Sequence, residues 1–492
     1  MSELIGRKRE ITLLHHCLKS KEAEFIAVYG RRRVGKTFLV KTLVNSLPPH
    51  KNIFLEVSGI KNGTLKEQLA NFMDAMAKTF HKSLIHQSPR TWKEAFLLLS
   101  QEIERLPKHQ TVVIFLDELP WLSSPKSNLI PQLDYFWNNV WSSIPTFKLI
   151  VCGSAAAWML DQLIHSKGGL YNRITRSILL QPFSLSETAQ YLASRKIKLS
   201  RSQIIELYMV MGGIPHYLKN IEPGKSAIQN INQLCFTPDG LLYEEFPRLF
   251  QSLFNASNQH EKLVREIAKK RYGISRTELL AAASLPSGGK IDKIIDELEA
   301  SRFIKKIIPY GKSKKDQYFK IIDEYTMFYL QWIEPIKSES IAIKTNYWHT
   351  KYKTAAWQSW AGYAYESICY KHVDTIMHKL GITNIGSIIG SWRYVPKKGE
   401  PQMGAQIDLL FDRDDNIITL CEIKFNDTDF VLTKQYAMEI LERNQLFAKQ
   451  LKTNKQIFTC FITKEKIKNN LWAQEIVDQN VVLEDLFDQG VQ

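Results

Sequence analysis

The chain has 492 residues, of which 44% are hydrophobic and 23% are charged, and its formal net charge is +15. This length is too great for one hydrophobic core, so we expect several domains, and the balanced composition excludes a long disordered or low-complexity segment. The positive charge favours a polyanionic partner, nucleic acid and DNA in particular, although a basic surface that binds nothing would have the same net charge.

The first predicted element is an apolar strand over residues 24–29, followed by GRRRVGKT at residues 30–37 and then a helical pattern. Strand, glycine-rich loop and helix follow in the order of a P-loop, whose backbone N–H groups and helix N-terminus hold phosphates. We expect Lys36 to meet the β- and γ-phosphates of ATP and Thr37 to meet Mg²⁺. The alternative is a glycine-rich turn that matches by chance. The predicted nucleotide contacts in the loop are Gly30, Arg31, Arg32, Arg33, Val34, Gly35, Lys36 and Thr37.

Two more apolar strands bring polar side chains to the same sheet edge. Residues 111–116 are almost wholly apolar, as a central parallel strand should be, and they lead to Asp117 and Glu118. Carboxylates at the C-terminal end of such a strand lie where the sheet binds ligands, so we expect Asp117 to hold Mg²⁺ and Glu118 to orient the attacking water. The run at 148–152 leads to Ser154, a candidate γ-phosphate sensor. The alternative for the two acidic residues is a solvated strand end.

These motifs resemble the archaeal-type ATPase family, a branch of the AAA+ and STAND ATPases, over essentially the whole chain. The family's N-terminal box is similar to IGR at residues 5–7 with Glu10, and its Walker B motif is similar to VVIFLDELPWL at 112–122. Its next strand, with a serine at the end, is similar to residues 151–154. The resemblance implies a P-loop α/β fold that binds and hydrolyses ATP with Mg²⁺.

An arginine after these strands also resembles the family pattern. LYNRIT at residues 170–175 is similar to the family's arginine-bearing segment, which makes Arg173 a candidate arginine finger. Asn172 stands where we expect glycine. A finger that acts in trans would require neighbouring subunits, so one expectation is a homo-oligomer. The alternative is a structural arginine in a salt bridge.

Residues 184–220 show apolar spacing of three and four, which predicts helices that we interpret as the lid of the ATPase. They include GGIP at residues 212–215. By resemblance to related ATPases, Gly213 and Pro215 are expected near the adenine base. From the residues alone, GGIP is first of all a helix stop and a turn.

Residues 261–320 have the pattern of a winged helix, because two helical segments precede a third at 290–300 and then a hairpin-like stretch at 303–322. The hairpin is basic, which suits contacts with phosphates. The third helix is largely acidic, a poor composition for entering a major groove. We therefore expect a connecting domain with sequence-independent contacts to nucleic acid at most.

Residues 406–425, QIDLLFDRDDNIITLCEIKF, predict a β-hairpin with its turn at RDDN. With the pairing centred near Asp415, Asp408 lies opposite Glu422, about 5 Å away. Lys424 shares the face of Glu422, because strand alternation has period two. Two facing carboxylates repel each other and are costly to bury, so a cation is expected between them. Oxygen ligands favour Mg²⁺ or Mn²⁺.

This arrangement resembles the PD-(D/E)xK nuclease core, formed here by Asp408 and by Glu422 with Lys424. The helix glutamate of that family is similar to Glu366, and Ile407 stands where the motif has proline. The pattern points to metal-dependent phosphodiester hydrolysis, in which the lysine activates water or stabilises the developing charge. The alternatives are a salt bridge of Lys424 with one of the two acids, and a degenerate nuclease that binds DNA without cutting it.

The apolar runs and the cysteines indicate the setting of the protein. The longest apolar runs are strand-sized, far below the ~18 residues of a membrane span. The N-terminal sequence MSELIGRKRE is charged where a secretory peptide would be apolar. The six cysteines lie singly, without CxxC spacing. We therefore predict a cytoplasmic protein with reduced cysteines and no membrane contact.

The patterns predict an α/β chain in four parts. These are a P-loop ATPase core with a parallel sheet (1–183), a helical lid (184–255), a winged-helix domain (256–335) and an α/β restriction-endonuclease-like domain (336–492). Two functions fit them. The first is an ATP-regulated, metal-dependent nuclease acting on DNA. The second is a nucleotide-switched binding or signalling protein with an inactive nuclease-like domain.

Overall fold

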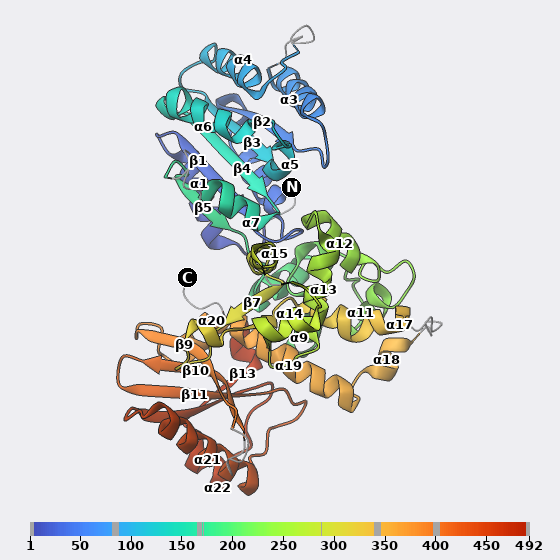
Figure 1. Cartoon of the computed structure of the whole chain (residues 1–492), viewed down its shortest axis with the longest axis vertical. Helices are drawn as coiled ribbons and strands as arrows, with labels where there is room; N and C mark the ends of the chain where they lie inside the picture. The colour runs from blue at the N-terminus through green and yellow to red at the C-terminus, as the bar shows by residue number, and fades with distance from the viewer. Residues whose placement is uncertain are drawn as a thin grey trace.

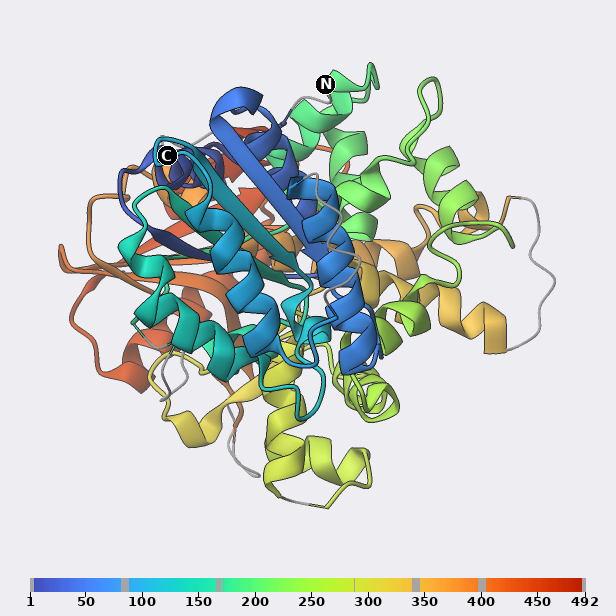
Figure 2. The same cartoon turned by 90° about the horizontal axis from the view of Figure 1, so that it is seen from above.

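The structure is a computed structural model of the whole chain, and it describes residues 4–80, 88–164, 170, 172–286, 288–338, 346–396 and 404–488. One β-sheet lies at each end of the long axis, and helices fill the space between them (Figure 1). Seen from above, the N-terminal sheet and its helices lie in front of the C-terminal sheet (Figure 2). Within the described residues, no helix is long and apolar enough to cross a membrane.

The N-terminal sheet has five parallel strands in the order β2-β3-β4-β1-β5. The strands β1, β3 and β4 are apolar and almost wholly buried, as strands covered on both faces should be. The predicted parallel α/β fold is therefore confirmed. The strands are β1 (Glu24–Tyr29), β2 (Asn52–Ser58), β3 (Thr111–Asp117), β4 (Phe147–Gly153) and β5 (Arg176–Leu179).

Helices cover both faces of this sheet. On one face, Ile26 and Val28 pack with α1 and α2, while on the other Phe25 and Ala27 pack with α3, α4 and α6. Side chains of one strand alternate between the two layers because the strand period is two. The helices of this region are α1 (Lys8–Lys19), α2 (Lys36–Asn45), α3 (Leu65–Phe80), α4 (Trp92–Glu104), α5 (Leu119–Leu122), α6 (Leu129–Asn139) and α7 (Ala156–Met159).

Short helices follow where the lid was predicted. The first, α8, begins at a capping box in which Ser184 and Glu187 satisfy each other's backbone N–H groups. The second, α9, ends at Gly212 in the left-handed conformation that glycine favours. The helices are α8 (Leu185–Ser194), α9 (Arg201–Met211), α10 (Pro215–Leu218), α11 (Ala227–Cys235) and α12 (Glu245–Leu253).

The next region contains the helices α13 to α17 and a small antiparallel sheet in the order β6-β8-β7. The pair β7 and β8, with the turn between them (304–321), is named the β7–β8 hairpin. The elements are α13 (Ser257–Ala268), β6 (Ile274–Ser275), α14 (Arg276–Ala282), α15 (Gly289–Ala300), β7 (Ile304–Ile307), β8 (Tyr318–Ile321), α16 (Glu324–Phe328) and α17 (Glu334–Ser338).

The C-terminal sheet is mixed and has the order β13-β12-β11-β10-β9. The strands β9, β10 and β11 are antiparallel, whereas β11, β12 and β13 are parallel. The elements are α18 (Tyr347–Lys351), α19 (Ala355–Lys371), α20 (Val373–Lys379), β9 (Ser387–Tyr394), β10 (Ala405–Arg413), β11 (Ile417–Lys424), α21 (Lys434–Leu451), β12 (Gln456–Thr463), α22 (Leu471–Ile476) and β13 (Gln479–Val482).

The N-terminal sheet region, the helices that follow it and the C-terminal sheet region share one continuous hydrophobic core. A single cluster of buried apolar residues extends from α1 and α2 through the lid helices to α19 and one face of the C-terminal sheet. The six cysteines are free and buried. These regions therefore pack directly against one another.

Candidate functional site

The phosphate loop between β1 and α2 depends on glycines for its shape. Gly30 has φ 140°, and a Cβ atom there would lie 2.4 Å from the carbonyl oxygen of Leu180, so only glycine fits. Gly35 has φ 96° and precedes the first residue of α2. From the N-terminal box, Arg7 is buried and donates a hydrogen bond to the Val34 carbonyl (3.2 Å). The loop is thus held at the N-terminus of α2, where phosphates bind.

Lys36 and Thr37, the last two residues of the loop, make hydrogen bonds to different partners. Lys36 is buried, and its Nζ donates hydrogen bonds to the carbonyl oxygens of Gly30 and Arg31, both at 3.0 Å. Thr37 Oγ1 donates to Asp117 Oδ2 at 2.8 Å. Burial raises the pKa of Asp117, and the Thr37 hydrogen bond opposes that rise. The loop and the acidic strand end, 80 residues apart in sequence, therefore meet.

Glu118 and Ser154 form the next part of the same site. The Glu118 carboxylate accepts hydrogen bonds from Ser154 Oγ (2.8 Å) and from the Ser154 backbone N–H (3.1 Å). Glu118 has φ 49°, in the left-handed region that a side chain of this size rarely occupies. Such strain persists where surrounding structure fixes it, which is common at functional sites. The predicted water-orienting residue and the predicted phosphate sensor are thus neighbours.

Three separate segments therefore converge at the C-terminal edge of the sheet. Residues 4–221 match the family described as an ATPase domain predominantly from Archaea. The chain contains an archaeal-type ATPase domain. Over 449 residues it is 23% identical to the uncharacterized protein MJECL04 of Methanocaldococcus jannaschii, covering 90% of this chain and 92% of that protein.

Two solved structures are similar to the chain. The Walker-type ATPase paby2304 of Pyrococcus abyssi aligns with 18% identity and a TM-score of 0.46, covering 67% of this chain and 96% of that chain. The ORC2 protein of Aeropyrum pernix, in complexes with ADPNP and ADP, aligns with 13% identity and a TM-score of 0.43, covering 69% of this chain and 96% of that chain.

The three arginines of the phosphate loop contact three different regions of the chain. Arg31 forms a buried ion pair with Asp323, which lies between β8 and α16. Arg32 lies over the ring of Trp121, directly after the Walker B strand. Arg33 forms an ion pair with Glu245 at the start of α12, at 2.6 Å. These contacts connect the loop to the rest of the molecule. Their partners, far away in the sequence, were not predicted.

The remaining predicted ATPase residues lie outside this hydrogen-bonded cluster. Arg173 is exposed before β5, and none of its described contacts joins it to the loop. Asn172 has φ 65°, a left-handed conformation that asparagine tolerates. The backbone at this position is therefore one that the expected glycine would also adopt. Gly213 accepts a hydrogen bond from the Phe183 N–H (2.8 Å), and Pro215 begins α10. The helix stop and turn are therefore present, and the adenine contact stays a prediction.

The C-terminal hairpin has the predicted register. Leu409 pairs with Cys421 in this register, and Asp408 and Glu422 are the residues that directly adjoin this pair. The pairing of β10 with β9 is irregular between Ile407 and Leu410, and Asp408 lies in this bulge. A bulge changes the direction of a side chain relative to regular alternation.

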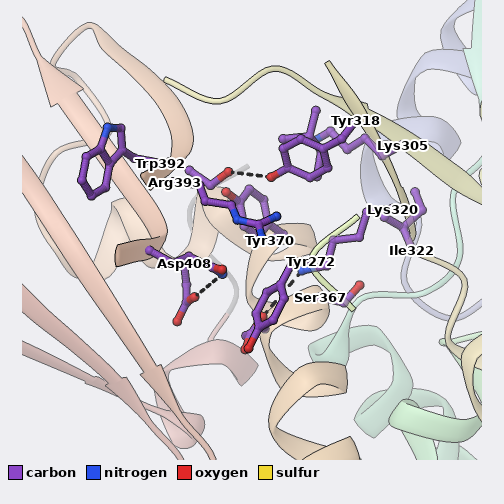
Figure 3. A pocket seen from close by; sticks show the side chains of 14 residues that line it. Tyr272, Lys305, Tyr318, Lys320, Ile322, Ser367, Tyr370, Trp392, Arg393 and Asp408 are labelled. Carbon is purple, nitrogen blue, oxygen red and sulfur yellow. Dashed lines mark hydrogen bonds and ion pairs between the residues drawn. The ribbon is translucent and has the colours of Figure 1, made fainter. Parts of the chain in front are cut away.

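Asp408 and Glu366 line one pocket, which the β7–β8 hairpin closes. Figure 3 shows Lys320 of this hairpin entering from one side and Asp408 from the other. Lys320 Nζ lies 3.6 Å from Glu366 Oε2, and Gln406 Nε2 donates to Asp408 Oδ1 at 3.0 Å. The free space between these side chains is about 40 Å³.

Glu422 is surrounded by donors from its own strand and from α21. Its carboxylate is 4% exposed and accepts hydrogen bonds from Tyr436 and from Arg443 (2.6 Å), and Lys424 Nζ lies 2.9 Å away. Burial would raise the pKa of Glu422, but Arg443 and Lys424 outweigh it and the pKa lies below its usual value. The predicted alternative of a Glu422–Lys424 pair is thus present, with Glu422 buried and the Lys424 side chain 34% exposed.

Asp408 has the opposite electrostatic environment. Burial, then the charge of Glu366, then that of Glu422 raise the pKa of Asp408 to about 7. Burial also raises the pKa of Glu366, against the opposing charges of Lys320 and Arg271. Within the described residues, no three carboxylate, histidine or cysteine side chains are grouped closely enough to hold a metal ion.

The sequence interpretation missed the cations that balance this cluster. Lys320 lies in the stretch predicted as a hairpin (303–322), but no role was predicted for it, for Tyr436 or for Arg443. Tyr436 and Arg443 lie seven residues apart on α21, hence on one helix face. That spacing was a usable signal, whereas nothing local to Lys320 indicates Glu366 as its partner.

Proposed function

We propose that the chain is an ATP-regulated, metal-dependent nuclease that acts on DNA. The observation that supports this proposal is the register of the β10–β11 hairpin, whose pairs run from Asp412–Ile418 to Leu409–Cys421 and adjoin Asp408 on one strand and Glu422 on the other, with Lys424 Nζ 2.9 Å from Glu422. Glu366 comes from α19 to the pocket that Asp408 lines. These four residue types in this order are those of a phosphodiesterase core. The net charge of +15 favours a polyanionic substrate.

At the ATPase site, the residues fit a nucleotide with Mg²⁺. The Thr37 hydroxyl and the Asp117 carboxylate, 2.8 Å apart, are the oxygen ligands that would hold the ion. Mg²⁺ would neutralise charge on the β- and γ-phosphates. Lys36 adds a positive charge, and Glu118, fixed by Ser154, orients water for attack on the γ-phosphate.

At the C-terminal site, the donor set also fits a hard divalent cation. Asp408 and Glu422 would hold Mg²⁺ or Mn²⁺, which supplies charge stabilisation at the scissile phosphate. Burial first, and then the charges of Glu366 and Glu422, raise the pKa of Asp408, so a cation beside this carboxylate would stabilise its ionised form. Lys424, whose pKa is raised because the attraction of Glu422 outweighs burial, stays protonated and stabilises developing negative charge.

The nuclease proposal is tested by separating the two activities. Asp408→Ala should remove Mn²⁺-dependent DNA cleavage while ATP hydrolysis persists, because Asp408 belongs to the C-terminal pocket. Lys36→Ala should remove ATP binding, since the ammonium that is held at the Gly30 carbonyl is the group expected to meet the β- and γ-phosphates. The proposal fails if the purified chain cleaves neither DNA nor RNA with any divalent metal or nucleotide.

A second function is favoured by the cations at the C-terminal site. Arg443 and Lys424 lie against Glu422, and Lys320 lies against Glu366, so protein side chains already supply positive charge there. This would suit a nucleotide-switched binding or signalling protein with an inactive nuclease-like domain. In that case, Lys36→Ala abolishes the biological effect, while Asp408→Ala and Lys424→Ala leave it unchanged. The reverse pattern excludes this function.

The exposed Arg173 supports a homo-oligomer in either case. An arginine finger must reach the γ-phosphate, and an exposed guanidinium can do so from a neighbouring subunit. Mixing Arg173→Ala chains with Lys36→Ala chains tests this assembly. Hydrolysis above that of either variant alone would support a finger acting in trans, and its absence would contradict it.

A further inference from the structure

The segment from Lys320 to Glu324, which runs from β8 into the first residue of α16, contacts both candidate sites. At its start, Lys320 lies against Glu366 in the C-terminal pocket. Three residues later, Asp323 forms a bidentate ion pair with Arg31 of the phosphate loop, and its Arg31 Nη2 to Oδ2 distance is 3.2 Å. The two sites are therefore connected through a short piece of backbone.

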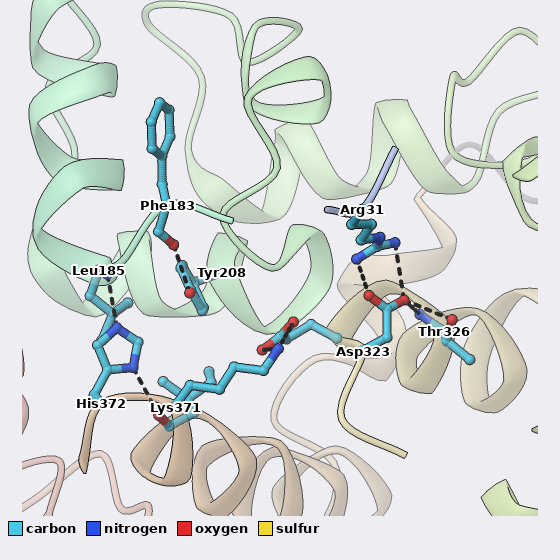
Figure 4. Close-up of polar contacts among 10 residues, drawn as sticks. Arg31, Phe183, Leu185, Tyr208, Asp323, Thr326, Lys371 and His372 are labelled. Atoms are coloured by element: carbon cyan, nitrogen blue, oxygen red, sulfur yellow. Dashed lines mark hydrogen bonds and ion pairs between the residues drawn. The ribbon is translucent and has the colours of Figure 1, made fainter. Parts of the chain in front are cut away.

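The connection to the phosphate loop is buried and well defined. Arg31 is 4% exposed and Asp323 is 1% exposed. Asp323 also caps α16, accepting hydrogen bonds from the N–H (2.9 Å) and Oγ1 (2.7 Å) of Thr326 (Figure 4). A buried charge cannot lose its partner without a large penalty, so Arg31 and Asp323 either move together or separate in a distinct second state.

The next residue connects the segment to the helix that carries Glu366. Glu324 is fully buried, and its carboxylate accepts hydrogen bonds from Lys371 Nζ at 2.6 and 2.7 Å (Figure 4). Lys371 is the last residue of α19. The segment thus contacts α19 at two points, through Lys320 and through Glu324.

The β7–β8 hairpin also covers the C-terminal pocket. At its turn, Tyr310 stacks on Phe447 with ring centres 6.2 Å apart and donates to Asp412 Oδ2 at 2.6 Å. On β8, the hydroxyl of Tyr318 lies 3.2 Å from Ser391 Oγ. The remaining space of about 40 Å³ is far below the ~300 Å³ of a typical small-ligand pocket. A nucleotide of DNA cannot reach Asp408 and Glu366 together until the hairpin moves.

We propose that the β7–β8 hairpin is a cover over the C-terminal site that ATP releases through Arg31 and Asp323. This proposal rests on the proposed nuclease function of that site. In the closed arrangement, Lys320 supplies positive charge to Glu366, where a divalent cation would otherwise act. Release of the hairpin exposes the carboxylates to both metal and DNA.

The differential contact that drives the release lies at the backbone of Arg31. Lys36 Nζ donates to the Arg31 carbonyl, and the same ammonium must leave that oxygen to meet the phosphates. The phosphates also compete with Asp323 for the Arg31 guanidinium, because arginine binds phosphate and carboxylate in the same bidentate way. ATP therefore favours the state in which Asp323 and its segment are released.

Two lysines of the same hairpin provide the test in the full chain. Lys320→Met removes the positive charge beside Glu366. Lys306→Met removes an equal charge whose partners, Asp296 and Glu299, both belong to α15. Calorimetric titration measures the Kd for ATP, and cleavage of linear duplex DNA with Mn²⁺ is measured with and without ATP.

Coupling is reciprocal, so a variant that favours the open cover must bind ATP more tightly. We expect Lys320→Met to bind ATP about fivefold or more tightly than the wild type and to cleave DNA without ATP as fast as the wild type does with it. Lys306→Met should match the wild type in both assays. If the melting temperature of Lys320→Met falls, both assays are repeated with Lys320→Gln, whose side chain keeps a polar end.

The two assays separate the cover from the nuclease. If Lys320→Met and Lys320→Gln tighten ATP binding and no chain cleaves DNA, the coupling stands and the nuclease function fails. If the wild type cleaves DNA equally with and without ATP, and the Lys320 variants leave the Kd for ATP unchanged, the nuclease stands and the cover is overturned. An equal change in Lys306→Met would also overturn it, since the effect would not belong to Glu366.

Discussion

At the phosphate loop, the carboxylates of Asp117 and Glu118 accept hydrogen bonds from the neutral hydroxyls of Thr37 and Ser154. At the C-terminal site, Glu422 lies instead against the guanidinium of Arg443. Hydroxyl partners orient a carboxylate and leave its charge for an incoming cation, whereas ammonium and guanidinium partners neutralise it in advance. On the proposed function, the first site takes a metal-bound nucleotide without losing a charged partner of these carboxylates, whereas at the second site a metal replaces protein cations.

The largest expected effect is a loss of ATP hydrolysis, which tests the comparison at the ATPase site. Glu118→Gln should lower the rate of ATP hydrolysis by about 10²- to 10⁴-fold, because the amide cannot accept a proton from the attacking water. ATP binding, measured by titration, should persist. Glu56→Gln is the matched control, because Glu56 is also on the sheet but pairs with Lys41 on the surface. Loss of binding in Glu118→Gln, or an equal rate loss in the control, would contradict the assigned role.

The next effect concerns the buried connection between the two sites. Asp323→Ala leaves the Arg31 guanidinium buried without its partner, so we expect a loss of about 3–5 kcal/mol in the free energy of unfolding. Urea denaturation measures it. Glu222→Ala, which removes an exposed pair with Lys225, should have a much smaller effect on the free energy of unfolding, because solvent screens exposed ion pairs. Similar losses in the two variants would show that the Arg31–Asp323 pair is not specially important.

The difference between the two sites also explains what the sequence could predict. The phosphate loop is contiguous from residue 30 to 37, and the hairpin register follows from its turn residues and the strand period, so both were confirmed. The Arg31–Asp323 pair joins residues 292 apart, and no local pattern specifies such a contact. Tertiary packing alone decides which cation meets which buried carboxylate.

Asp408→Asn tests the comparison at the C-terminal site, because it removes a buried negative charge. The pKa of Asp408 lies at about 7 in the fold against 3.8 ordinarily, so the fold binds this proton more tightly than the unfolded chain does. Stability is therefore lost as pH rises from about 4 to 7. At pH 8 without metal, the variant should be more stable by up to about 4 kcal/mol. Thermal melting measures the difference.

The same variant tests the metal site without relying on activity. Mn²⁺ should raise the melting temperature of the wild type at pH 8, because it binds the folded carboxylates, and should have little effect on Asp408→Asn. Asp415→Asn, at the exposed turn of the same hairpin, is the control and should respond like the wild type. An equal Mn²⁺ response in Asp408→Asn would place the ion elsewhere.

The smallest expected effect lies between the sites, where His372 joins α19 to the start of α8. Its Nε2 accepts a hydrogen bond from the Leu185 N–H (3.0 Å), and its Nδ1–H donates to the Ile368 carbonyl (2.8 Å), so the ring is neutral. Burial, more than the charge of Lys371, lowers the pKa of His372 from 6.5 to about 4. The unfolded chain therefore gains this proton first as pH falls.

Stability from His372 is fully present above pH 6.5 and is lost as pH falls toward 4, by about 3 kcal/mol at the lower limit. His372→Gln cannot gain a proton, so its melting temperature should fall less than that of the wild type between pH 6.5 and 4.5, even if it is lower at pH 7.5. His378→Gln, at an exposed position on the following helix α20, is the control and should keep the wild-type dependence of melting temperature on pH. If the melting temperature of His372→Gln falls with pH as steeply as that of the wild type, protonation of His372 does not weaken the junction between α8 and α19, the helix that carries Glu366.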